Sequence, residues 1–127
     1  MIGGVRLPPP AAVVFVADVA RMSAFYCTLF AMEVVQADDA HAVLAIDGLQ
    51  LTVHALAGAD ASGPTREDSY LKLCFPVPSI AEARVRAAVL GGEVWPVDRE
   101  WEATSRGFRA CDGRDPEGNV FQVREPL

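Results

Sequence analysis

Basic residues are scarce in this sequence. Lysine and arginine together number 11 against 17 aspartate and glutamate residues, and the formal net charge is −6. A protein surface that binds the phosphates of nucleic acid needs lysine and arginine gathered on one face, and no stretch of this chain supplies such a cluster. We therefore expect no nucleic-acid partner.

Cysteine is also scarce. The three residues Cys27, Cys74 and Cys111 match no zinc-binding spacing. An odd number of cysteines does not build a disulfide framework, so buried thiols in a reducing compartment are expected. This composition favours a cytoplasmic location.

Long apolar runs are missing as well. The apolar stretch at residues 11–17 follows three prolines and stops at Asp18. It is too short for a membrane-spanning helix and makes no plausible core of a signal peptide. We expect neither membrane insertion nor export. The 127 residues, 51% of them hydrophobic, suffice for one core, so a single domain over residues 1–127 is predicted.

A turn and a strand near the C-terminus form the most informative motif. Residues 115–124 read Asp-Pro-Glu-Gly-Asn and then Val-Phe-Gln-Val-Arg. Pro116 and Gly118 suit the backbone angles of a tight turn, and the alternation that follows is typical of a half-buried strand. Residues 47–54 repeat the acid, the glycine and the alternating strand.

A second pair of similar stretches lies upstream. Residues 16–21 and 77–82 each lead from an apolar strand into a helix. We interpret the chain as two copies of one module, each made of a strand, a helix and three strands. The modules span residues 11–57 and 69–127, and residues 58–68 link them.

The expected elements follow from periodicity and from turn residues. The first module is predicted to contain a helix capped by Asp18 and strands at residues 12–16, 32–36, 41–46 and 49–56. The second is predicted to contain a strand at 70–75, a helix from the Ser79 cap to Leu90, a strand at 93–97 and a final strand from Val120. Residues 98–106 are expected to be an extra polar loop whose Trp101 forms a lid, contacts a partner or folds back onto the core.

A family resemblance rests on these features together. The two-copy plan, the helix that starts Val19-Ala20-Arg21, the helix exit at Gly91-Gly92, and Gly107-Phe108-Arg109 ahead of the 115–119 turn resemble the glyoxalase/bleomycin-resistance/dioxygenase superfamily, also called the vicinal oxygen chelate fold. The resemblance implies an α+β fold, in which two βαβββ modules form curled mixed sheets around a cup. It also implies a homodimer. It specifies function poorly, because the superfamily contains metal-dependent enzymes and metal-free drug-binding proteins.

The metal centre of the superfamily's metal-dependent members is not expected here. The resemblance places their ligand positions at Ala11, Thr52, Lys72 and Gln122 of this chain. A divalent cation needs His, Asp, Glu or Cys donors, whereas alanine has no donor and a charged lysine repels the ion. A register error would bring in His54, and one histidine does not make a site. We predict no metal and no other cofactor.

Strand alternation around those positions predicts the lining of the cup. Trp101 joins this set as the aromatic residue of the extra loop. The predicted ligand-binding residues are Phe15, Gln50, Thr52, His54, Lys72, Cys74, Trp101, Gln122 and Arg124. An apolar floor with a few polar groups is typical of a small-molecule pocket.

Two functions fit this lining. The first is a metal-free protein that sequesters an aromatic or anionic small molecule, with Lys72 meeting an anion. The alternative is a lyase, isomerase or dioxygenase of the same superfamily, either metal-dependent or using Lys72 or His54 as an acid–base group. The sequence shows no carboxylate or histidine pair at acid–base distance, so no catalytic residue is predicted.

Overall fold

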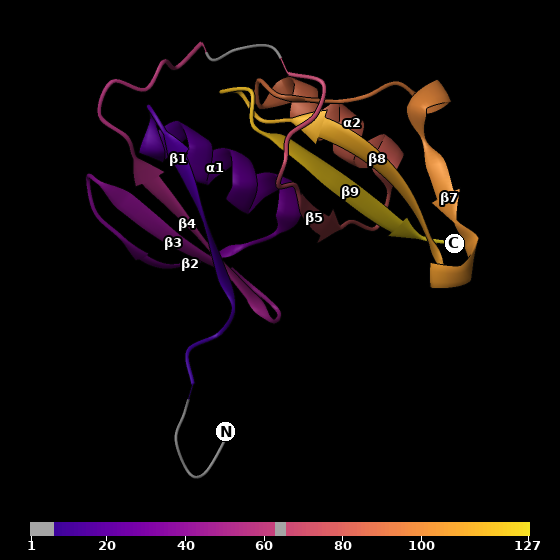
Figure 1. Cartoon of the computed structure of the whole chain (residues 1–127), viewed down its shortest axis with the longest axis horizontal. Helices are drawn as coiled ribbons and strands as arrows, with labels where there is room; N and C mark the ends of the chain where they lie inside the picture. The colour runs from indigo at the N-terminus through magenta and orange to yellow at the C-terminus, as the bar shows by residue number, and fades with distance from the viewer. Residues whose placement is uncertain (1–6, 63–65) are drawn as a thin grey trace.

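The first sheet is built by the N-terminal half of the chain. The structure is a computed structural model that describes residues 7–62 and 66–127. The strands β1 (Ala11–Val16), β2 (Glu33–Ala37), β3 (His41–Ile46) and β4 (Leu49–Ala55) form a sheet in the order β1-β4-β3-β2 (Figure 1). Strand β1 runs parallel to β4, and the other neighbours are antiparallel. The sheet is therefore mixed, as predicted.

The second sheet is built by the C-terminal half. Its strands are β5 (Leu73–Pro76), β6 (Glu93–Val94), β7 (Trp101–Ala103), β8 (Phe108–Arg114) and β9 (Val120–Pro126). The order is β5-β9-β8-β6, and β7 also pairs with β8. Strand β5 is parallel to β9, just as β1 is parallel to β4. Two mixed sheets with few helices confirm the predicted α+β class, and the sheets do not close.

Each helix begins at the cap that the sequence predicts. Helix α1 (Val19–Phe30) starts after Asp18, whose side chain accepts a hydrogen bond from the Arg21 amide. Helix α2 (Ile80–Val89) starts after Ser79, whose hydroxyl accepts from the Glu82 amide. Such caps satisfy backbone amides that have no partner inside the helix.

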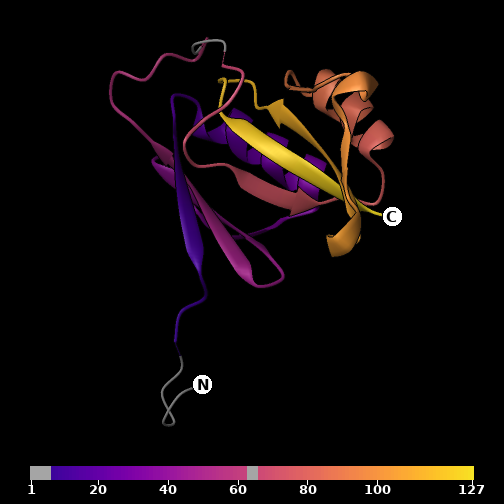
Figure 2. The ribbon, with the colours of Figure 1, turned by 45° about the vertical axis from the view of Figure 1, so that its right-hand side comes forward.

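Helix α1 connects the two sheets. It packs on β3 and β4 of its own sheet. Its aromatic side chains also reach the second sheet, where the Phe30 ring stacks on Phe75 at 4.1 Å and the Phe25 ring lies 6.0 Å from that of Phe121. Figure 2 shows α1 behind β9 and β5 accordingly. The core is therefore shared by both halves of the chain.

The turn between β8 and β9 is fastened to α1 by a buried carboxylate. Asp115 accepts hydrogen bonds from the backbone amides of Glu117 and Asn119, and the Tyr26 hydroxyl of α1 donates to it at 2.6 Å. Burial raises the pKa of Asp115, and the hydrogen bonds from Tyr26 and Asn119 offset part of that rise. Gly118 takes a positive φ of 89°, which the turn motif predicts.

A second buried carboxylate holds the chain just before α1. Glu117 accepts hydrogen bonds from the backbone amides of Ala17 at 2.7 Å and Asp18 at 2.9 Å. A buried carboxylate is costly unless hydrogen bonds satisfy it, and these two amides lie about a hundred residues away along the chain. The turn therefore fixes the position of β9 relative to β1 and α1.

Three expected elements differ from the structure. The strand expected at residues 70–75 begins only at Leu73, so Lys72 lies just before β5 and not in mid-strand. The strand expected at 93–97 stops at Val94, ahead of Pro96. The extra loop expected at 98–106 contains strand β7 between two 3-10 turns, Val97–Arg99 and Thr104–Arg106. Part of the expected linker, residues 63–65, lies outside the described residues.

No helix in the described part of the chain is long and apolar enough to cross a membrane.

Removing the hydroxyl of Tyr26 should destabilise the fold. Tyr26→Phe deletes a hydrogen bond to the buried Asp115 carboxylate, and we expect the free energy of unfolding to fall by about 1.5–3 kcal/mol. Urea unfolding measures this change. The matched control is Tyr70→Phe, because Tyr70 is the other tyrosine and is fully exposed. Equal losses of unfolding free energy in both variants would show that the hydrogen bond from Tyr26 to Asp115 does not stabilise the fold.

Candidate ligand-binding site

Both sheets have one face turned away from the helices, which we call the open face. In β4, Leu51 and Val53 are buried in the core, whereas the alternate residues are only partly buried. In β9, Phe121 and Val123 belong to the core, so Gln122 and Arg124 lie on the opposite side. Alternation therefore puts the predicted lining residues of these strands on the open faces.

A chain of polar contacts crosses the open face of the second sheet. The Lys72 ammonium lies 2.6 Å from Oδ2 of Asp112 and 3.0 Å from Oδ1 of Asp68. The Gln122 amide donates to the other oxygen of Asp112 at 3.1 Å, and Nε of Arg124 donates to Oε1 of Gln122 at 2.7 Å. Three predicted site residues are thus linked through Asp112, which the sequence analysis missed.

The charge on Lys72 is already balanced. Burial alone lowers the pKa of Lys72, but the hydrogen bonds and charges of Asp112 and Asp68 outweigh it, and the net pKa lies above the usual lysine value. The ammonium therefore stays protonated at neutral pH. The anion that the sequence analysis expected beside Lys72 is supplied by the protein itself.

An aromatic and cationic cluster continues this face beyond Arg124. The Arg124 guanidinium lies over the Phe108 ring at 4.4 Å, and the Arg106 guanidinium lies over the same ring at 4.9 Å. The Trp101 ring meets Phe108 edge-on at 6.1 Å and is 45% exposed. Within residues 7–62 and 66–127, neither guanidinium has a carboxylate partner. We call Trp101, Arg106, Phe108 and Arg124 the arginine cluster.

The open face of the first sheet carries rings in a row. Phe15 of β1 lies 5.7 Å from His54 of β4, and His54 lies 5.9 Å from His41 of β3. Phe15 and its neighbour Val13 on the same face are each 53% exposed. Three adjacent strands thus present an exposed, mostly apolar surface.

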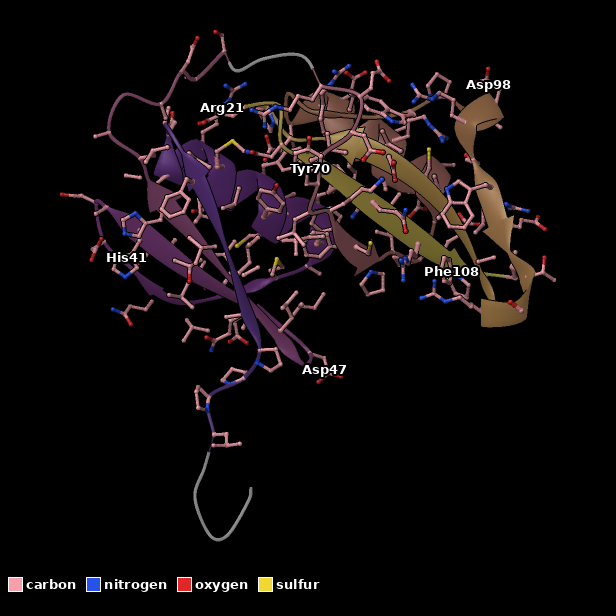
Figure 3. All side chains as sticks on the ribbon, viewed as in Figure 1. Arg21, His41, Asp47, Tyr70, Asp98 and Phe108 are labelled. Atoms are coloured by element: carbon pink, nitrogen blue, oxygen red, sulfur yellow. The ribbon has the colours of Figure 1, made fainter. Side chains whose placement is uncertain are left out.

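The predicted residues fall into two groups. Phe15, Gln50, Thr52 and His54 belong to the first sheet, and Lys72, Cys74, Trp101, Gln122 and Arg124 belong to the second. Figure 3 places His41 and Phe108, one from each open face, on opposite sides of the molecule. No hydrogen bond, ion pair or ring contact joins the two groups among the described side chains. We call these two groups the candidate half-sites.

Sequence reasoning missed several residues of these half-sites. Asp112 faces Gln122 directly in the β8–β9 pairing, so the hairpin register carried a signal for it. Phe108 and Arg106 flank the Gly107 turn, and their contact with Arg124 depends on that same register. Their chemistry is visible in the sequence, but their proximity is not.

A cavity of about 380 Å³ lies between the two sheets at the edges β1 and β5. Its apolar lining includes Val13, Phe15 and Leu73, and its polar lining includes Tyr26 and Asn119. It adjoins the open face of the first sheet through Val13 and Phe15. This size is within the range of small-molecule pockets.

The family follows from the sequence match. A family model described as a glyoxalase-like domain matches residues 11–124. The chain belongs to the glyoxalase-like family. This confirms the resemblance to the glyoxalase/bleomycin-resistance/dioxygenase superfamily. No curated protein matches the sequence.

Solved structures agree on the fold. A glyoxalase/bleomycin resistance protein/dioxygenase family enzyme from Burkholderia phytofirmans is 19% identical with a TM-score of 0.70, and the match covers 92% of this chain and 97% of that one. A mutant of the fosfomycin resistance protein FosX from Listeria monocytogenes, with Mn(II) and 1S,2S-dihydroxypropylphosphonic acid, is 20% identical with a TM-score of 0.68, covering 100% and 93%. At this identity the likeness shows the fold alone.

The residues at the superfamily's metal positions do not fit a divalent cation. Ala11 offers no donor, and the Lys72 ammonium occupies Asp112, the nearest carboxylate. Gln122 donates its amide to that same carboxylate. In the part of the chain that the structure describes, no group of three or more His, Cys, Asp or Glu side chains could hold a metal ion. The donor set therefore disagrees with a metal centre of that type.

The ion pair between Lys72 and Asp112 should stabilise the fold. Both side chains are mostly buried, so we expect a coupling energy of about 1–2 kcal/mol from a double-mutant cycle with Lys72→Met and Asp112→Asn. Because the pKa of Lys72 is raised on folding, this stabilisation is present below the usual lysine pKa and is lost as the pH rises through the raised value.

The control pairs Lys72→Met with Asp68→Asn, since Asp68 is well exposed and its ion pair should contribute little. Urea unfolding at neutral and alkaline pH gives the two coupling energies and their dependence on pH. Equal coupling to Asp68 and Asp112, or no loss at alkaline pH, would contradict the assignment.

Proposed function

We propose that the protein binds a planar small molecule that carries an anionic group, without a metal ion at the positions used by the superfamily's metal-dependent members. The observation that carries the proposal is the arginine cluster. It combines two guanidiniums that lack a carboxylate partner among the described residues with two aromatic rings, on the open face of the second sheet.

The free guanidiniums account for the anion. Four other arginines of the second half, Arg84, Arg99, Arg109 and Arg114, each pair with a glutamate, whereas Arg86 is exposed on α2, away from the open face. Gln122 holds only Nε of Arg124, so the two terminal nitrogens of that guanidinium stay available. A guanidinium with free terminal nitrogens binds a carboxylate or phosphate group through two parallel hydrogen bonds.

The aromatic rings account for the planar part of the ligand. Trp101 is half-exposed beside the free guanidiniums, and an exposed indole offers a stacking surface. On the first sheet, Phe15 and His54 offer a second surface of the same kind. A planar ligand between such surfaces would bury both of its faces.

A homodimer would bring unlike half-sites together. Each chain leaves the open face of its first sheet uncovered, with Val13 and Phe15 half-exposed and Leu71 largely exposed nearby. Exposed apolar patches that are rimmed by polar residues mark association surfaces. A two-fold arrangement would place the first sheet of one chain against the second sheet of its partner and close two equal cups.

The enzyme alternative gains no specific support from Lys72. Its raised pKa makes it a poor base, because the ammonium keeps its proton at neutral pH. The cytoplasm is the compartment that we propose, because Cys27, Cys74 and Cys111 are free thiols.

Naphthalene-2-carboxylate is a suitable probe of the anion site. We expect it to bind about tenfold or more tightly than naphthalene-2-carboxamide, since a charged hydrogen bond contributes about 1.5–3 kcal/mol. Arg124→Gln should remove this preference. Quenching of Trp101 reports binding, because the other tryptophan, Trp95, is buried.

The matched control is Arg86→Gln, which removes the same charge from an exposed position on α2. A chelator should leave the affinity unchanged in every variant. Equal losses of affinity for naphthalene-2-carboxylate in the Arg124 and Arg86 variants would refute the anion site. A loss of affinity caused by the chelator would refute metal-free binding.

The open face of the first sheet should mediate dimerisation. Light scattering at micromolar concentration should give the mass of two chains, and Phe15→Glu should weaken the dimer by at least about tenfold, because it buries a charge without a partner. Val89→Glu is the control, since Val89 is exposed on α2 away from that face. A monomeric wild-type protein would rule out the shared cup.

A further inference from the structure

A second cavity lies on the helix side of the first sheet. Helix α1 packs on β3 and β4, whereas every residue of β2 is exposed. A cavity of about 580 Å³ lies between the first turns of α1 and the β2–β3 hairpin. It is lined from β2 by Val34 and Ala37, which pair with the core residues Leu44 and Ala42 of β3. Residues paired directly across two strands share a face, so this cavity lies on the side opposite to the open face.

The interior of this cavity is aliphatic. Val19 of α1 and Val34 of β2 line it from two sides, and no aromatic ring lines it among the described residues. Five alanines supply most of the remaining apolar surface: Ala17, Ala20, Ala37, Ala42 and Ala55. Methyl groups bind an aliphatic chain by excluding water and offer no ring for stacking. The lining therefore favours an aliphatic ligand over an aromatic one.

Three carboxylates also line the cavity, namely Asp18, Asp38 and Asp39. Within residues 7–62 and 66–127, no lysine or arginine pairs with any of them, and only the His41 ring meets Asp38. The backbone amides of Ala40 and His41 donate to Asp38 and lower its pKa, so this side chain is a carboxylate at neutral pH. The uncompensated negative charge favours a cationic group on the ligand.

A buried hydroxyl adds a third kind of contact. Ser23 of α1 lines the cavity, and its Oγ is buried without a hydrogen-bond partner among the described residues. Buried polar atoms in native proteins nearly always have such a partner. Ser23 follows the Asp18 cap by five positions, which is about 7.5 Å along the helix axis. Three bonds of an extended chain span about 3.3–3.6 Å, so a chain of about six bonds covers this distance.

We propose that this cavity binds an aliphatic amine with a second polar group at its far end, such as an amino alcohol. The ammonium meets Asp18 and Asp39, the chain lies on the alanines, and the hydroxyl bonds to Ser23. Exposed carboxylates alone would hold any cation weakly, because water and salt screen them. The aliphatic interior and the buried hydroxyl provide the selectivity. The site involves neither the arginine cluster nor the open face of the first sheet.

Nuclear magnetic resonance of the ¹⁵N-labelled full-length protein with 6-aminohexan-1-ol tests the proposal. We expect the amide shifts to cluster at Ala20, Ser23 and Ala42. The affinity should be about tenfold or more above that for hexane-1,6-diol, which lacks the charge, and that for methylamine, which lacks the chain. Hexan-1-amine should bind at least about threefold more weakly than the amino alcohol, and Ser23→Ala should remove this difference.

Matched variants test the cavity and its charge separately. Ala20→Leu fills the cavity from an exposed position of α1 and should lower the affinity at least about tenfold, whereas Ala88→Leu makes the same change on exposed α2 and should have no effect. Asp39→Asn should weaken binding about two- to fivefold. Its control is Asp47→Asn, since Figure 3 shows Asp47 at the opposite end of the sheet from His41, which follows the Asp38–Asp39 turn.

Equal affinities for 6-aminohexan-1-ol and hexane-1,6-diol, or amide shifts outside the cavity, would overturn the proposal without any variant. An affinity of Ala20→Leu within twofold of wild type would overturn it too. Ala20→Leu should leave the binding of naphthalene-2-carboxylate unchanged, and Arg124→Gln should leave the binding of the amino alcohol unchanged. The two sites can therefore fail independently.

Discussion

The fold depends on two buried carboxylates in one turn. Asp115 and Glu117 lie between β8 and β9, yet their hydrogen-bond partners include Tyr26 of α1 and the amides of Ala17 and Asp18. A buried carboxylate tolerates little displacement of its donors, since each lost hydrogen bond leaves charge without compensation. The second sheet is therefore placed relative to the first by directional contacts, while the shared aromatic core supplies non-directional attraction. This combination leaves the open face of each sheet uncovered by the helices.

The sequence predicts the parts of the fold that depend on local chemistry. The caps at Asp18 and Ser79 are where their spacing placed them, and β3 has the predicted bounds, because caps and alternation are set within a few residues. Strand β7 was missed. Its three residues are too few to show alternation, and it exists because its backbone pairs with β8. A short strand of this kind is a consequence of tertiary structure.

The candidate site was predicted in part for the same reason. Alternation along β9 correctly separates Gln122 and Arg124 from the core residues between and beside them. It does not show which charges meet. Lys72 is neutralised by Asp112, a residue forty positions away, whereas Arg124 has no carboxylate partner among the described residues. That Arg124 and not Lys72 lacks a carboxylate partner follows from the pairing register of β8 and β9, and that register depends on where the intervening turn is anchored.

These pairings also resolve a conflict between the overall charge and the proposed ligand. The molecule carries a net charge of −6, which on its own disfavours an anion. On the open face of the second sheet, Lys72, Arg106 and Arg124 contribute three positive charges, against two negative charges from Asp68 and Asp112. The local sum is therefore +1. Screening at physiological ionic strength limits exposed charges to a range of about 8 Å, so an anion at the arginine cluster responds mainly to these near groups. The acidic residues elsewhere on the protein slow the association of an anion more than they weaken its binding at the arginine cluster.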